Sequence, residues 1–229
     1  MYSPPLRRFL CLLALSVAAA SLMPAAAPKW LSLFDGKTLA GWKQTDGLAK
    51  VEVRAGMIVG IVTPGAGNTY LATEDTSFGD FIFECEFKCD AGINSGVQFR
   101  SRFADQVINR SYGYQYEIDS TTRALTGGLQ EAGRRAWLAP TANRGEPQQA
   151  WLKAHGDILK PNAWNTARIE ARGRRLRTWL NGQLMADFED KADVAIPRGF
   201  IGIQIHATKN AALFGKEVAF RNLRVQRLD

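Results

Sequence analysis

Cysteine and histidine are scarce in this chain: its 229 residues contain three cysteines and two histidines. Cys11 lies in the N-terminal apolar run, which leaves Cys85 and Cys89 in the rest of the chain. Four residues of extended strand span about 13 Å, beyond the roughly 7 Å limit for disulfide-bonded Cα atoms. Neither residue belongs to a spaced metal-binding motif. We therefore expect two free core cysteines on the same strand face as Phe83 and Phe87.

Long apolar runs are missing after the N-terminus. Residues 1–27 combine Arg7 and Arg8, an apolar run and the small residues of "MPAAA", which is the order typical of a cleaved secretory signal. No later run approaches the roughly 20 apolar residues of a transmembrane helix. We expect cleavage after Ala27, export to the periplasm or out of the cell, and a mature protein that is not integral to the membrane. A retained N-terminal anchor is the minor alternative.

A strong charge of one sign is also lacking. Without Arg7 and Arg8 the net charge falls from +7 to +5. The remaining basic residues are scattered, whereas nucleic-acid-binding proteins gather them in a stripe with interleaved aromatic residues. We predict a solvated surface and no nucleic-acid partner, and the sequence leaves the oligomeric state open.

Helical periodicity is weak, whereas alternation of apolar and polar residues with period two recurs throughout residues 28–229. Asn181-Gly182 between two alternating runs predicts a type I′ hairpin turn. About a dozen antiparallel strands in about 200 residues predict a single all-β domain, a two-sheet antiparallel jelly-roll sandwich. Strands are expected at residues 49–53, 57–62, 69–73, 80–88, 95–103, 112–120, 166–172, 176–181, 183–189, 200–207 and 218–228.

One long segment interrupts this pattern. Residues 131–165 show no strand periodicity, and a short helix is expected at 146–154. Connections longer than about 15 residues in a compact domain are usually functional or disordered. Because this segment contains Trp137, Leu138 and Trp151, we expect an ordered loop that caps one sheet.

Polar residues of particular types occupy the non-core face of three predicted strands. They are Gln98 and Arg100, then Gln115, Glu117 and Asp119, and finally Gln204 and His206. A solvated strand face accounts for such residues when each is taken singly. A solvated face usually carries Lys, Thr and Ser, however, so this mixture of amides, carboxylates, arginine and histidine indicates a binding or catalytic site.

Several chemistries have little support in the sequence. The serines stand in no Gly-x-Ser-x-Gly motif, so a serine hydrolase is not predicted. No His-x-His or His-Glu-x-x-His spacing indicates a metal, and no cofactor is predicted. A divalent metal held by Glu117, Asp119 and His206 stays open as an alternative.

The ordered motifs of the whole chain resemble one known family. "LSLFDGKTLAGW", "FGDFIFECEFK", "INSGVQFRS", "GYQYEID", "TGGL", "NAWNTARIEARG", "LNG", "GFIGIQIH" and "FRNLRV" are similar to the 3-keto-disaccharide hydrolase family, over Trp30 to Leu228. The resemblance implies a concanavalin- or laminin-G-like jelly roll, and an exported enzyme that cleaves glycosides oxidised at C3. Gln130 departs from the family, whose members often have an aromatic residue there, so the resemblance does not imply sugar stacking at that position.

The chemistry of a 3-keto sugar gives these residues roles. A base removes the acidic C2 proton, the C1 substituent leaves, and water then adds. We assign Glu117 as the base and His206 as an acid or as partner to the enolate. Arg100 and Gln115 hold the ketone oxygen, with Gln204 on the same sugar-binding face. Asp119 is the third candidate catalytic group, paired with Glu117 if hydrolysis is direct and inverting.

The rim of the site is assigned to Glu131, Arg135 and Trp137, which follow the "TGG" turn. Alternatively, Arg134 and Arg135 only tie the long loop to Glu131 or Asp119. A competing function for the whole domain is a non-catalytic, lectin-like carbohydrate-binding module, because a jelly roll does not fix function. Binding without turnover of both oxidised and plain sugars would favour that alternative.

Overall fold

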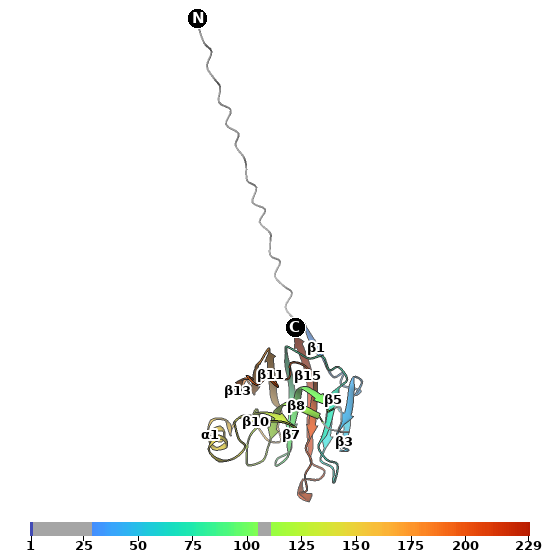
Figure 1. Ribbon diagram of the computed structural model, residues 1–229. Helices are drawn as coiled ribbons and strands as arrows, with labels where there is room; N and C mark the ends of the chain where they lie inside the picture. Colours follow the sequence, from blue (N-terminus) through green and yellow to red (C-terminus); the bar gives the residue numbers. More distant parts are fainter. Residues whose placement is uncertain (2–28, 105–110) are drawn as a thin grey trace.

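The computed structural model describes Met1 and residues 29–104 and 111–229, so the expected signal segment lies almost wholly outside the described residues. Two antiparallel sheets pack face to face (Figure 1). The predicted all-β, two-sheet sandwich is therefore confirmed. Within the described part of the chain, no helix is long and apolar enough to cross a membrane.

The seven-stranded sheet carries the residues that matter for function. Its order, from one edge to the other, is β10 (Ala136–Ala139), β9 (Leu129–Ala132), β8 (Ser111–Asp119), β7 (Asn94–Phe103), β14 (Phe200–Ile205), β5 (Thr69–Thr73) and β2 (Trp42–Thr45). β8 and β7, which are neighbours in the sequence, lie at its centre. The long connection from β7 to β14 lets strands from the middle and the end of the chain meet there.

The eight-stranded sheet forms the second layer. Its order is β13 (Gln183–Glu189), β12 (Arg175–Leu180), β11 (Asn165–Arg172), β6 (Phe81–Cys89), β15 (Glu217–Arg227), β4 (Met57–Ile61) and β3 (Lys50–Arg54), and β1 (Trp30–Ser32) also pairs with β15. β12 and β13 form the hairpin predicted at Asn181-Gly182, whose φ angles of 50° and 83° are those of a type I′ turn.

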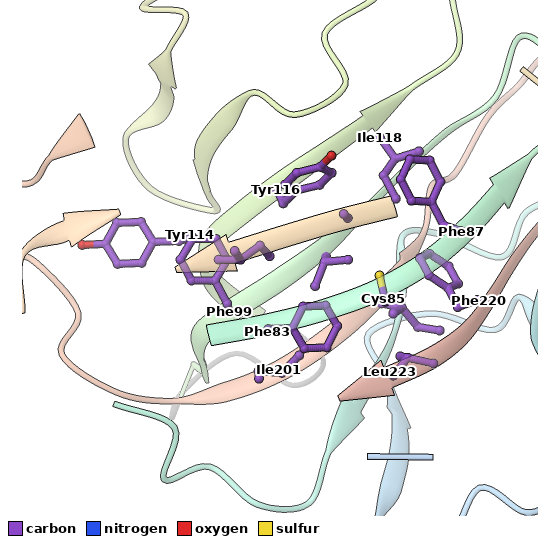
Figure 2. Packing of buried hydrophobic residues seen from close by; sticks show 14 of the residues in the cluster. Phe83, Cys85, Phe87, Phe99, Tyr114, Tyr116, Ile118, Ile201, Phe220 and Leu223 are labelled. Carbon is purple, nitrogen blue, oxygen red and sulfur yellow. The ribbon is translucent and has the colours of Figure 1, made fainter. Parts of the chain in front are cut away.

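Alternate residues of both sheets meet between the layers. Figure 2 shows Phe83, Cys85 and Phe87 of β6 approaching side chains of β8 such as Tyr116 and Ile118. Cys85 and Cys89 are free and buried, as predicted, and burial raises the pKa of both thiols. Because one face of each strand is committed to this core, the opposite face is left for polar side chains.

The segment 131–165 differs partly from expectation. The predicted helix is present as α1 (Gly145–His155), and it lies at the edge of the sandwich near β10 (Figure 1). The expectation that the segment contains no strand is wrong, because β10 pairs with β9 and extends the seven-stranded sheet. The backbone hydrogen bonds of this pairing stabilise β10 as a strand, although its sequence lacks the alternation of apolar and polar residues. A short helix, η1 (Ala211–Leu213), follows β14.

Candidate active site

Strand register gathers polar side chains on the face of the seven-stranded sheet that points away from the core. Residues opposite one another in an antiparallel sheet share a face, and the intervening residues of β7 and β8 are in the core. We call this surface the amide face. It carries Gln130 on β9, Gln115 and Glu117 on β8, Gly96 and Gln98 on β7, and Gln204 on β14.

The carboxylate of Glu117 is held by three amide groups. Asn94 donates to Oε1, and Gln115 and Gln130 donate to Oε2 over 3.0 and 2.6 Å. Arg123 adds a positive charge, with Nη2 at 3.8 Å from Oε1. These contacts come from three strands and one loop, so the orientation of the carboxylate depends on the assembled sheet.

Burial controls the protonation of Glu117. Its side chain is only 2 % exposed, and this desolvation, together with the charge of Asp119, raises the pKa of Glu117 to about 7. The hydrogen bonds from Asn94 and Gln130 and the charge of Arg123 oppose the rise but do not cancel it. A carboxyl group with a pKa near 7 can act as a general base near neutral pH.

A hydrogen-bonded chain extends from Gln115 across the sheet. The Gln115 amide donates to Gln204 Oε1 over 3.2 Å, and Gln204 Nε2 donates to the Tyr70 hydroxyl over 3.0 Å. Burial raises the pKa of Tyr70 to about 12, so its hydroxyl stays protonated near neutral pH. Gln115 and Gln204, both predicted site residues, are therefore brought together with Glu117.

Asp119 serves to position the neighbouring loop. Its Oδ1 accepts hydrogen bonds from the backbone N–H and the hydroxyl of Thr121 over 3.0 and 2.6 Å. Its Oδ2 lies 2.9 Å from Arg123 Nη2. Asp119 thus holds Arg123 beside Glu117 by an ion pair, while its Oδ1 is hydrogen-bonded within the loop.

His206 follows β14 and lines a cavity of about 360 Å³ next to Glu117. Asn94 and Arg123, which both contact Glu117, also line it. The His206 residue is exposed, yet desolvation by the surrounding protein lowers the pKa of its imidazole. The positive charge of Arg123 lowers this pKa further. A neutral imidazole is therefore the main form at neutral pH. The remaining lining residues are Val62, Gly92, Ile93, Thr121, Ala207, Thr208 and Leu213.

Arg100 is not part of the amide face, which corrects the prediction for this residue. The register shifts between Phe99 and Arg102, and Arg100 has a φ of 46° at this bulge. Its buried guanidinium donates to the carbonyl oxygens of Gly79 and Gly173, both over 2.7 Å, and it also donates to Asp80. The bulge breaks the alternation that would have placed Arg100 beside Gln98.

Glu131 and Arg135 lie in a structural network, which corrects their assignment to a sugar-binding rim. Glu131 pairs with the core residue Tyr114, so it faces inward, and it accepts hydrogen bonds from Arg134 and Arg135. Arg135 also donates to Asp190 over 2.8 Å. The tying role, which the sequence left as an alternative, is what these contacts support.

Trp137 lies near the amide face. It pairs with Gln130. Its ring also lies close to Gly128: a Cβ atom added to this glycine would be 3.2 Å from Trp137 Cζ3. Gly128 accepts the backbone hydrogen bond of Glu117. The ring is half-buried and also packs against the core, so Trp137 lies beside Gly128 at the edge of the amide face.

A larger cavity of about 760 Å³ lies on the eight-stranded sheet. Its carboxylates are already paired, Glu84 with Arg168 and Arg224, and Glu86 with Arg221. Desolvation alone would raise the pKa of Glu86, but the hydrogen bonds and charge of its partners outweigh it and lower the pKa. A carboxylate held ionised by arginine is a weak base, so we place the chemistry at Glu117 rather than at this larger cavity.

Metal ligation was the alternative left open by the sequence. Over residues 29–104 and 111–229, the structure assembles no group of three or more His, Cys, Asp or Glu side chains that could hold a metal ion. The alternative triad is not assembled, because Asp119 is engaged by Thr121 and Arg123 while His206 faces the cavity.

Residues 29–226 match the model of a family described as the 3-keto-alpha-glucoside-1,2-lyase-like domain. The chain belongs to this family. The match spans both sheets and every residue of the amide face, so the family resemblance predicted from the sequence is confirmed. No curated protein matches the chain.

Solved structures similar to this family member share its fold. A protein from Parabacteroides distasonis, named as a candidate glycosyl hydrolase, is 20 % identical, with a TM-score of 0.59 and coverage of 87 % of this chain and 94 % of its own. The carbohydrate-binding module CBM66 from Bacillus subtilis is 16 % identical, with a TM-score of 0.54 and coverage of 81 % and 95 %. A Bacillus subtilis protein with a galectin-like fold is 13 % identical, with a TM-score of 0.61 and coverage of 87 % and 94 %. At these identities the likeness establishes a galectin-like sandwich.

Several residues of the site were not predicted from the sequence. Asn94 could have been found, because it continues the alternation of β7 on the face of Gly96. Gln98 was placed on this face from the sequence but was given no role. Gln130 was seen only as a departure from the family pattern, yet it donates directly to Glu117. Arg123 lies in a loop, and only the folded chain brings it to Glu117.

Proposed function

We propose that this protein is an exported enzyme that cleaves glycosides carrying a ketone at C3, by elimination at C1 followed by hydration. The observation that carries the proposal is the buried carboxylate of Glu117, whose pKa is raised to about 7 and which is oriented by three amide donors. Membership of the 3-keto-alpha-glucoside-1,2-lyase-like family supports the choice of substrate.

The reaction needs a base, a group that stabilises negative charge and a place for the leaving group. The base takes the C2 proton, and the C–H electron pair forms the enolate of the C3 ketone. The enolate then collapses, the C1–O bond breaks, and its electron pair goes to the leaving oxygen, which takes up a proton. Water adds across the C1–C2 double bond and gives the free 3-keto sugar.

The described residues match these requirements. Glu117 is the proposed base. Arg123 is positively charged, lies 3.8 Å from Glu117, is 38 % exposed and lines the neighbouring cavity, so it can stabilise negative charge on the leaving oxygen. Desolvation lowers the pKa of His206 and so favours its neutral imidazole, whose ring N–H can donate a hydrogen bond. Donors aimed at developing charge typically contribute about 3 kcal/mol each to transition-state stabilisation.

The difference in polarity between the amide face and the neighbouring cavity supports one orientation of the substrate. The amide face offers polar groups that have no partner among the described residues, namely the amide of Gln98 and Oε1 of Gln115, and these suit the hydroxyl groups of a sugar ring. The neighbouring cavity is lined by the aliphatic side chains of Val62, Ile93 and Leu213. We therefore place the sugar on the amide face, the leaving group in the cavity, and the bond that breaks at the border near Glu117.

Direct hydrolysis by Glu117 and Asp119 is less well supported. An inverting enzyme needs a second carboxyl group that is free to activate water or to protonate the leaving oxygen. Oδ1 of Asp119 is hydrogen-bonded to Thr121, and Oδ2 is ion-paired with Arg123 although it accepts no hydrogen bond within the described residues. Export of the protein, to the periplasm or beyond, is proposed from residues 1–27 alone.

Glu117→Gln tests the proposal directly. Purified wild-type protein is expected to release the leaving group from a 3-keto-α-glucoside but not from the unoxidised glucoside. Glu117→Gln is expected to lower kcat by about 10²- to 10⁴-fold, whereas Glu146→Gln, on the exposed surface of α1, leaves it unchanged. For the wild type, kcat/KM should rise with pH through about 7, since only the ionised Glu117 accepts a proton.

Two results would contradict this function. Full activity of Glu117→Gln would show that another group is the base. Binding of oxidised and plain sugars without turnover by the wild type would instead support a carbohydrate-binding module.

A further inference from the structure

Gln98 is a buried amide that the fold does not use. It lies on β7 with 0 % of its surface exposed. Neither its Oε1 nor its Nε2 has a hydrogen-bond partner among the described residues. A buried polar atom without a partner is destabilising, so folded proteins rarely retain one unless water or a ligand binds to it.

The position of Gln98 connects it with the candidate active site. On one side it lies opposite Gln115, and on the other it lies opposite Gly202 of β14. The Gln115 side chain leans over Gly96 towards Glu117, and its Nε2 donates to Glu117 and Gln204. Gln115 Oε1, like the Gln98 amide, lacks a partner within the described part of the chain.

Gln204 provides the contrast. It lies on the next strand of the same face and is 3 % exposed. Its Oε1 accepts from Gln115 and its Nε2 donates to Tyr70. These two buried glutamines of one face therefore differ in their hydrogen bonds: the fold satisfies the hydrogen bonds of Gln204 and leaves those of Gln98 open.

We propose that Gln98 is a sugar-recognition residue, whose amide binds two neighbouring oxygens of the substrate. One carboxamide offers an acceptor and N–H donors in a single plane. That arrangement matches an α-hydroxy ketone, in which the ketone oxygen accepts from Nε2 and the adjacent hydroxyl donates to Oε1. Gln115 Oε1 accepts from a further hydroxyl. This inference rests on the proposed function, because it takes the 3-keto sugar as the ligand of the amide face.

The test compares Gln98→Met with Gln204→Met, because methionine has nearly the size of glutamine without its polar groups. For Gln98→Met, we expect a Tm about 2–6 °C above the wild-type value, and a kcat/KM for methyl 3-keto-α-glucoside about 5- to 50-fold lower. For Gln204→Met, we expect a lower Tm, since two hydrogen bonds are lost. Gln98→Leu serves as a second apolar replacement and should change both quantities in the same direction as Gln98→Met.

The interpretation depends on the expected rise in Tm together with the expected fall in kcat/KM for the Gln98 variants. If Gln98→Met and Gln98→Leu both lower the Tm, Gln98 is structural and the proposal is wrong. If they raise the Tm but leave kcat/KM unchanged, the amide binds only water and the proposal is also wrong. The proposed function fails separately, if the wild-type protein turns over no 3-keto glycoside. In that case, titration of the same sugar by calorimetry reports whether Gln98 binds it.

Discussion

At the scale of single residues, the behaviour of Glu117 depends on two opposing effects. Removal of the carboxylate from water favours its neutral form, whereas the amide donors and Arg123 favour the ionised form. Desolvation is the largest effect, and it raises the pKa to about 7. Asp190 shows the opposite balance, because Arg135 and Tyr114 lower its pKa to about 2 although it is also buried. The hydrogen bond from the Arg135 guanidinium outweighs desolvation at Asp190, whereas desolvation outweighs the amide donors at Glu117.

The raised pKa of Glu117 makes a prediction about stability. Its ordinary value of 4.5 applies in the unfolded chain, so between pH 4.5 and about 7 the folded protein binds more protons than the unfolded one. The stabilisation that comes from protonation is complete below pH 4.5 and is lost as the pH rises through about 7. Relative to Glu117→Gln, wild-type protein should lose about 3 kcal/mol of unfolding free energy between pH 4.5 and 8.

Urea unfolding of both proteins across this pH range measures the difference. Comparison with Glu117→Gln cancels the contributions of the other titrating groups. A difference that stays constant with pH would show that Glu117 has an ordinary pKa in the folded protein.

At the scale of elements, the hairpin of β9 and β10 is fastened to the rest of the molecule by charges. Arg135 joins the buried carboxylates of Glu131 and Asp190, and Asp190 also accepts from the core hydroxyl of Tyr114. These contacts hold β10, and with it Trp137, at the edge of the seven-stranded sheet. A buried ion pair is costly to form, but removing one partner leaves a buried charge behind.

Arg135→Met is therefore expected to lower the unfolding free energy by about 3 kcal/mol at pH 7, which is a large share of the roughly 5–15 kcal/mol of a typical domain. Arg175→Met is the matched control, because its ion pair with Asp187 lies on the surface, and its loss should cost less than about 1 kcal/mol. Chemical unfolding of both variants measures the two values. Equal losses would mean that the Arg135 network does not fasten the hairpin.

At the scale of the whole molecule, the sandwich brings distant segments together around the candidate active site. The cavity beside Glu117 is formed by residues near Val62, Ile93, Arg123 and Leu213, which come from four separate parts of the chain. The polar floor belongs to the sheet, while the cavity belongs to the loops beyond the ends of its strands. Under the proposed function, variation in these loops changes the leaving group that is accepted, while the residues of the sheet keep their catalytic roles.

Leu213→Ala is expected to lower kcat/KM for an aryl 3-keto-α-glucoside about fivefold, because it removes apolar surface from the leaving group. Methyl 3-keto-α-glucoside, whose leaving group is too small to reach far into the cavity, should be cleaved at an unchanged rate. Leu184→Ala, an exposed leucine on β13, is the control. The assignment of the cavity would be wrong if both substrates were affected equally.

Most of the fold followed from the sequence, because alternation is a local property. Each predicted strand has its counterpart in one of the two sheets, and the Asn181-Gly182 turn has the expected φ angles. Alternation also placed Gln115, Glu117 and Gln204 on non-core faces, where the structure has them. The short strands β1 and β2 were not predicted, because they are stabilised by pairing with strands distant in sequence. The hairpin of β9 and β10 was not predicted either, because it is stabilised by its pairing at the edge of the sheet.

The sequence by itself determined which residues could face away from the core, because a period of two fixes the side of a strand on which each side chain lies. Only the tertiary structure decided which of them meet. A bulge turned Arg100 towards Asp80, a loop brought Arg123 to Glu117, and close packing raised the pKa of Glu117. Register, bulges and desolvation depend on contacts between strands far apart in the chain, so no local pattern specifies them.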